Sequence, residues 1–189
     1  MTFNDKGLLR AMKKEYKGEG YIVAGTDGGY VICCENWGVY IREQAVPNTV
    51  KSVVVLHAGK LPEVGKAIKV RKGEAANWIY EMAVDRIEIL DALYKDRKRE
   101  TILPTRLTMD GYGLWQNPKT LAIQRIAPEN QQILDFTDND AYLIDGTIYG
   151  ATIYGSVYVA CEHIAYEDKP LVACLEQMQW IPVEVEYDV

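Results

Sequence analysis

The sequence predicts an α+β protein in which a mostly antiparallel sheet is packed by two or three helices. Short segments rich in β-branched and aromatic residues alternate with Gly, Asn and Asp turns along most of the 189 residues, a pattern typical of strands. Three other segments carry apolar residues three or four positions apart, as helices do. The hydrophobic fraction of 48% and the charged fraction of 25% are ordinary for a globular protein. We expect one compact unit over residues 1–189, with a sub-boundary near residues 97–106.

The N-terminal part of the sequence predicts one helix followed by a three-stranded meander. Asn4 or Asp5 is a suitable N-cap for a helix near residues 5–17, and Gly18 and Gly20 end it. The turn sequences TDGG and EN then separate three strand-like segments, residues 20–25, 29–34 and 37–43. Turns this short join antiparallel neighbours, so the three strands are expected to pair in sequence order.

The segment VPNTVKSVVVLHAGKLP is compatible with two structures. Its valine-rich composition favours a strand, whereas Asn48 as a cap, apolar residues at helical spacing and Gly59 as a stop favour a helix. We expect the helix, followed by a strand over residues 67–73. The strongest periodicity in the chain then predicts a long helix over residues 74–96, because an apolar stripe runs along it without an interrupting Gly or Pro.

Strand-like segments make up most of the sequence after Pro104. Turn residues separate these segments, and each is rich in residues that favour strands. The predicted strands cover residues 105–109, 120–126, 131–137, 141–145, 147–160, 170–176 and 180–187.

Charge is distributed unevenly along the chain, although the net charge is only −6. Residues 1–106 contain 18 Lys and Arg against 14 Asp and Glu, a sum of +4, whereas residues 107–189 contain 3 against 13, a sum of −10. Such asymmetry predicts either a basic surface that binds a partner or two halves that attract each other. If the two parts interleave in space, their fields largely cancel.

The first predicted helix has a cationic face opposite an apolar face. On a helical wheel its basic residues fall within an arc of about 100°, and they are Lys6, Arg10, Lys13, Lys14 and Lys17. Like charges three or four positions apart cost about 0.2–0.5 kcal/mol per pair. Nucleic acid or another polyanion would offset this cost, and so would carboxylates from the acidic C-terminal half. We predict that these residues bind nucleic acid, and that the surface extends if the fold brings further cations near: Lys66, Lys69, Arg71, Lys72, Arg97, Lys98 and Arg99.

The stretch GTIYGATIYGSVYVA, residues 146–160, predicts strands with a tyrosine-bearing face. Alternation places Tyr154 and Tyr158 on the side opposite the aliphatic residues. Tyr149 and Tyr154 lie five residues apart, so an unbroken strand would place them on opposite faces, and Gly150 would mark a bend between two segments. We predict that Tyr149, Tyr154 and Tyr158 bind a protein partner or a second copy of the chain. An ordinary amphipathic strand with half-buried tyrosines is the alternative.

Both ends of the sequence resemble the DNA sliding-clamp family of the bacterial polymerase III beta type. The N-terminal MTFNDKGLLRAMKKEYK is similar to the family's short first strand and lysine-bearing helix, and QWIPVEVEY is similar to its closing strand. The resemblance implies that the five basic residues of the helix line a DNA-facing surface. Glu184 and Glu186 stand where the family tends to be basic or neutral, and 189 residues are too few for three clamp domains. The chain also resembles uncharacterised proteins of phages and mobile elements of Gram-positive bacteria.

The sequence contains no catalytic, cofactor-binding or metal-binding pattern, and we expect a non-enzymatic binding protein without a cofactor. His57 and His163 lie in no metal-ligand spacing, and the four cysteines fit neither a disulfide framework nor a zinc site. Cys161 and His163 would share a strand face, which keeps a small hydrolase or transferase as a further alternative. No apolar run reaches the length of a membrane span and no secretory signal is found, so we expect a cytoplasmic protein that does not bind membranes.

Overall fold

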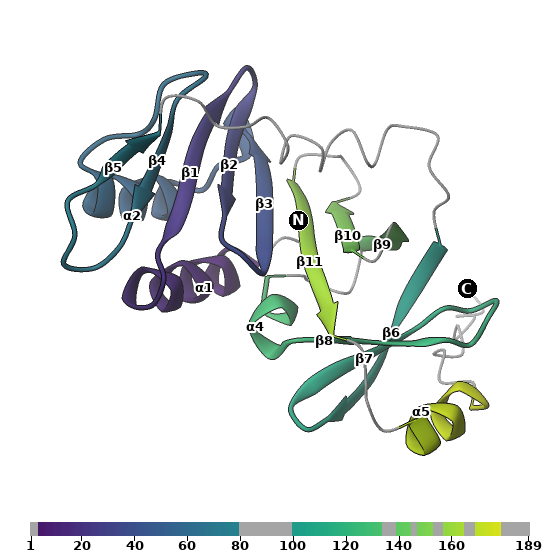
Figure 1. Cartoon of the computed structure of the whole chain (residues 1–189). Coiled ribbons are helices and arrows are strands. Elements are labelled where there is room, and N and C mark those ends of the chain that lie inside the picture. The colour runs from purple at the N-terminus through teal and green to yellow at the C-terminus, as the bar shows by residue number, and fades with distance from the viewer. Residues whose placement is uncertain are drawn as a thin grey trace.

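The computed structural model describes residues 4–79, 100–133, 139–144, 147–152, 157–164 and 169–178. These residues form a mixed α+β fold dominated by antiparallel strands, which confirms the predicted fold class (Figure 1). None of the helices among them is long and apolar enough to cross a bilayer.

The first half of the chain forms five strands of one sheet. The predicted meander is confirmed, because β1, β2 and β3 pair in sequence order. A fourth strand pairs with the free side of β1, and a fifth pairs with the fourth. The strands are β1 (Tyr21–Thr26), β2 (Gly29–Cys33), β3 (Trp37–Arg42), β4 (Ala67–Val70) and β5 (Asn77–Ile79).

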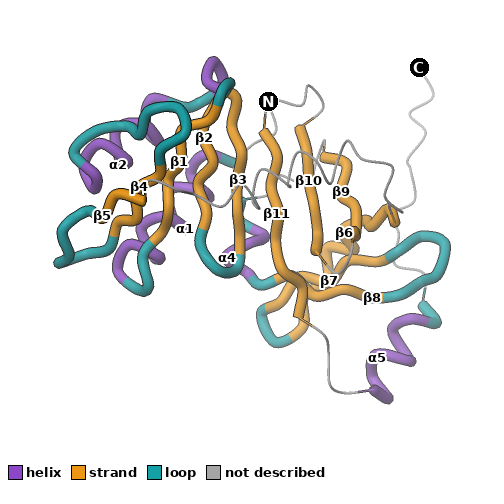
Figure 2. Tube along the Cα trace, turned by 45° about the horizontal axis from the view of Figure 1, so that its top comes forward, coloured by secondary structure: helices purple, strands orange, loops and turns teal. Residues whose placement is uncertain are grey.

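The second half contributes six strands that close into a ring. Their antiparallel pairings run β6–β7–β8–β11–β10–β9 and return to β6. Strand β11 also pairs with β3 and so joins the ring to the first sheet (Figure 2). The strands are β6 (Glu100–Met109), β7 (Tyr112–Gln116), β8 (Ile123–Ile126), β9 (Asn139–Ile144), β10 (Thr147–Thr152) and β11 (Val157–Ile164).

Two helices of the first half pack on one face of the sheet. Helix α1 (Asp5–Lys17) begins where the Asn4 side chain accepts a hydrogen bond from the Gly7 amide, as the sequence predicts. Helix α2 (Asn48–Ala58) ends at Gly59, whose φ of 82° favours glycine. A short 3₁₀ helix, η1 (Glu43–Ala45), leads from β3 towards α2.

One hydrophobic core joins the two halves. It contains Leu8 and Met12 of α1 and Val54 of α2. It also contains Ile102, which lies within the predicted sub-boundary, and Trp115, Ile126 and Ile133, which follow it. Helix α4 (Pro128–Gln131) lies against α1. The approach is closest at Gly7, where a β-carbon would collide with the backbone carbonyl of Gln132. Helix α5 (Lys169–Glu176) lies against β8.

The structure differs from the prediction at four segments. Residues 77–79 form β5 rather than the start of a helix, because they pair with β4; residues 80–96 lie outside the described residues. The strand predicted over 131–137 is wrong in its described part, where α4 ends in a turn. The strand predicted over 170–176 is α5. A short apolar run such as PLVACLE fits either structure, and its proline suits the first turn of a helix. Strand β7 has no counterpart in the prediction.

Replacing Gly7 by Ala is expected to destabilise the protein by about 1–3 kcal/mol, although Gly-to-Ala substitution inside a helix is ordinarily stabilising. The added methyl group meets a backbone carbonyl, which cannot rotate away. Urea denaturation measures the effect.

The matched control is Gly113→Ala, where the methyl group meets the end of the Gln131 side chain instead. Truncation of that side chain in the double variant Gly113→Ala/Gln131→Ala should restore stability. Gln132→Ala should not rescue Gly7→Ala. A Gly7→Ala protein as stable as the parent would contradict the close approach of α1 to α4.

Candidate nucleic-acid interface

The orientation of α1 follows from its apolar residues. Leu8, Ala11 and Met12 are buried in the core, so the opposite side of the helix lies at the surface. All five predicted site residues are exposed there, namely Lys6, Arg10, Lys13, Lys14 and Lys17. We call this set the cationic face of α1.

Most of this face forms no salt bridge with the residues that the structure describes. Among the residues that the structure describes, no carboxylate forms a salt bridge with Lys6, Arg10, Lys13 or Lys17. Lys14 does have an interaction partner. Other salt bridges of the described part lie around Glu63 and Arg71. The described carboxylates therefore form no salt bridge with four of the five cations.

The cationic face continues past the end of α1 onto the turn after β4. The Lys72 amide donates a hydrogen bond to the Tyr16 carbonyl at 2.8 Å, and Lys72 is exposed. Arg71 also reaches α1, since its Nε donates to the Gly18 carbonyl at 2.7 Å. The Arg71 guanidinium is shared with Glu19 at 3.6 Å and Glu74 at 3.1 Å, so it adds little free charge.

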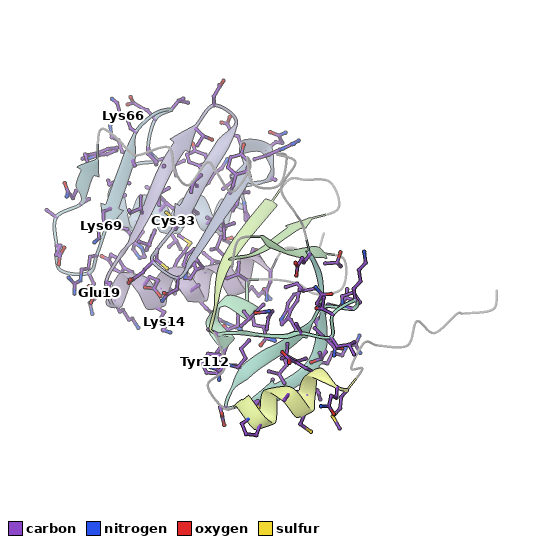
Figure 3. All side chains as sticks on the ribbon, turned by 45° about the vertical axis from the view of Figure 1, so that its right-hand side comes forward. Lys14, Glu19, Cys33, Lys66, Lys69 and Tyr112 are labelled. Carbon is purple, nitrogen blue, oxygen red and sulfur yellow. The ribbon has the colours of Figure 1, made fainter. Side chains whose placement is uncertain are left out.

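The other cations predicted to extend the cationic face either lie away from α1 or fall outside the described residues. Lys66 lies at the opposite end of the sheet from Lys14 and Glu19 (Figure 3). It pairs with Glu63 at 3.0 Å, and this hydrogen bond lowers the pKa of the Glu63 carboxyl. Lys69 is exposed on the sheet face opposite the buried Ile68, away from the helices. Arg97, Lys98 and Arg99 fall outside the described residues.

His57 lies beside the cationic face of α1, although the sequence did not indicate it. The imidazole of His57 on α2 stacks on the Tyr16 ring of α1, with centroids 3.7 Å apart and planes 4° apart. Its Nδ1 lies 2.8 Å from the hydroxyl of Tyr21 on β1. Helical spacing placed His57 on a helix, but only packing brings that helix beside α1.

Burial shifts the pKa values of Tyr21 and His57. Burial raises the pKa of the Tyr21 phenol, so the hydroxyl keeps its proton. Burial also lowers the pKa of His57, and the nearby Lys13 ammonium lowers it further. His57 is therefore neutral near neutral pH, held between two aromatic residues at the edge of the cationic face.

The predicted tyrosine surface is partly assembled by strand register. Tyr149 on β10 is opposite Ala160 of β11 and opposite Tyr142 of β9, whereas Tyr158 on β11 is opposite Tyr40 of β3. Because Ala160 and Tyr158 are two residues apart, all four tyrosine positions share one sheet face. Tyr154 lies outside the described residues. Tyr40 is only 8% exposed and has an interaction partner, so this end of the face is covered within the chain.

Two of the four cysteines lie in the core. Cys33 and Cys34 are buried, and burial raises the pKa of the Cys34 thiol to about 11, which disfavours the thiolate. Cys161 and His163 occupy alternate positions of β11 and so share a face. No three His, Cys, Asp or Glu residues gather as metal ligands in this part of the chain. An open groove of about 460 Å³ beside Gly25, Glu43 and Glu63 lies at the Lys66 end of the sheet.

Comparison with protein-family models, with curated proteins and with solved structures finds no match to this chain. The resemblance to sliding clamps therefore stays a prediction. Residues 1–3, at the start of the segment compared with the family's first strand, and the proposed closing strand over 180–187 lie outside the described residues.

Replacing Arg10 by Gln is expected to stabilise the protein by about 0.6–1.5 kcal/mol at low ionic strength, because Arg10 makes three like-charge contacts along α1, with Lys6, Lys13 and Lys14. Gln and Arg have similar helix propensities, so this comparison isolates charge. Urea denaturation at low salt and at about 1 M NaCl measures the gain, which should shrink at high salt. Destabilisation would show instead that acidic groups pair with the helix.

The free energy of unfolding is expected to decrease as pH falls below about 6.5. The folded state favours neutral His57, so the unfolded chain takes up its proton at higher pH than the folded chain does. The neutral ring's contribution to the free energy of unfolding is thus fully present above the pKa of the unfolded state. It is lost as the pH falls through the lower pKa of the folded state. Urea midpoints between about pH 7.5 and pH 5 should fall less in His57→Gln than in the parent. His163 remains in both proteins, and equal slopes would contradict the assignment.

Proposed function

We propose that this protein is a non-enzymatic accessory factor that binds nucleic acid through the cationic face of α1. The observation that carries the proposal is the set of exposed cations on one helix side, four of which form no salt bridge with a described carboxylate. Like-charge repulsion along such a face costs stability unless an anion offsets it. A polyanion supplies that offset at every position at once.

The dimensions of the face suit a phosphate backbone. Lys6 and Lys17 are eleven residues apart on α1, which corresponds to about 16 Å at 1.5 Å per residue. A duplex carries one phosphate charge per ~1.7 Å of its axis, so several phosphates lie within this length. Lys72 lengthens the cationic strip beyond the end of the helix. Contacts of this kind to phosphates give affinity without base specificity.

A protein partner or a second copy of the chain is the alternative occupant, and the shared face of Tyr142, Tyr149 and Tyr158 supports it. Tyrosines give contact area at low entropic cost. Against it, the Tyr40 end of that face is buried. The cationic face has the stronger support, because its side chains are exposed along the whole helix.

The protein is expected to bind a 20-base-pair DNA duplex with steep salt dependence, measured by fluorescence anisotropy. The slope of log K against log salt should be near −0.9 for each phosphate neutralised. Replacing Arg10, Lys13 and Lys17 together by Gln removes three contacts, so the slope should become shallower by about 2.7 and Kd at low salt should rise at least about tenfold.

The matched control replaces three lysines away from α1 by Gln, namely the partly exposed Lys66 and the exposed Lys69 and Lys119. It changes net charge equally and should bind like the parent. Equal loss in both variants would show that only net charge matters. No binding at low salt would overturn the proposal, and a salt-insensitive oligomer in light scattering would then favour the tyrosine face.

A further inference from the structure

His57 lies where α1, α2 and β1 meet, at the margin of the cationic face. Its ring is half-buried, stacked on Tyr16 at 3.7 Å and in contact with the Tyr21 hydroxyl at 2.8 Å. The backbone of Tyr16 in turn holds the amide of Lys72. The imidazole is therefore fixed in place beside Lys13 and close to the cationic strip.

We infer that His57 belongs to the anion-binding surface and takes up a proton when nucleic acid binds, so that affinity increases as pH falls. This inference rests on the nucleic-acid binding proposed above. It assigns the surface a proton-linked residue and makes its affinity responsive to pH in the range where a histidine titrates.

The groups that face His57 give its imidazolium no anionic neighbour in the described structure. Lys13 and Tyr16 face it from α1, and Tyr21 faces it from β1. Strand β4, which packs against α2, contributes the buried apolar residues Ile68 and Val70. No described carboxylate contacts the ring. Burial and Lys13 thus keep the free protein's His57 neutral by lowering its pKa.

A bound phosphate backbone reverses this balance. Phosphates beside Lys13 offset the charge that disfavours the imidazolium, and they stabilise a second cation nearby. The proton comes from solvent and goes to the imidazole, so one proton is bound for each complex formed. The contact with Tyr21 survives in both states, because a hydroxyl donates to a neutral ring nitrogen and accepts from a protonated one. No rearrangement of α1 against α2 is needed.

The test follows the two histidine signals by NMR across pH, in the free protein and with a saturating 20-base-pair DNA duplex. The chain contains only His57 and His163, and His57→Gln assigns them. The duplex should raise the pKa of His57 and leave that of His163 in place. Each unit of increase corresponds to about tenfold tighter binding at low pH than at high pH. In anisotropy, Kd for the parent should fall between about pH 7.5 and pH 5.5, by at most that factor.

His57→Gln should lose most of the pH dependence of Kd that the parent shows between about pH 7.5 and pH 5.5. Duplex binding with an unchanged His57 pKa, or with equal pH dependence in His57→Gln, would overturn this inference and leave the proposed function standing. Absence of duplex binding at both pH values would overturn the two together. The NMR titration uses the parent protein, so it decides the matter even if the variant does not fold.

Discussion

At Gly7 the backbone of α1 lies against the carbonyl of Gln132, with no space for a side chain. This contact joins the first helix to a segment more than a hundred residues later, and Leu8 and Met12 beside it enter the core shared by both halves. Once these residues are buried, the rotation of α1 about its axis is determined. The cationic face must then lie at the surface, because it occupies the other side of the same helix.

The same packing brings α2 to the site. His57 and Tyr16 form a parallel stack across the two helices, and Tyr21 anchors the ring from the sheet below. Partial burial and the neighbouring Lys13 lower the pKa of His57, so the free protein favours the neutral imidazole. On the proposed function, its position beside the cationic face of α1 makes its proton affinity depend on what that face binds.

The cationic face of α1 and the tyrosine face are the two candidate binding surfaces, and they differ in electrostatic cost and in burial. Like-charge repulsion along the cationic face of α1 costs free energy, and four of its cations form no salt bridge with a described carboxylate. A bound external anion would reduce this cost. The tyrosine face has no such cost, and Tyr40 at its β3 end is already buried. Strand β11, which carries Tyr158, pairs with β3, β8 and β10 and so joins the two halves of the chain.

Local sequence was sufficient for α1, the β1–β3 meander and α2, because Asn4, the glycine turns and Gly59 are signals that act over a few residues. It also identified all five basic residues of the candidate site, since helical spacing alone puts them on one side. Residues 77–79 and 170–176 were misread because short apolar segments adopt whichever structure their neighbours provide. The closed ring of strands, the contact between Gly7 and Gln132, and the placement of His57 beside α1 required the tertiary structure. Each depends on contacts between residues far apart in the chain. A local sequence pattern predicts that one face of an element is buried, but it does not predict which distant element buries that face.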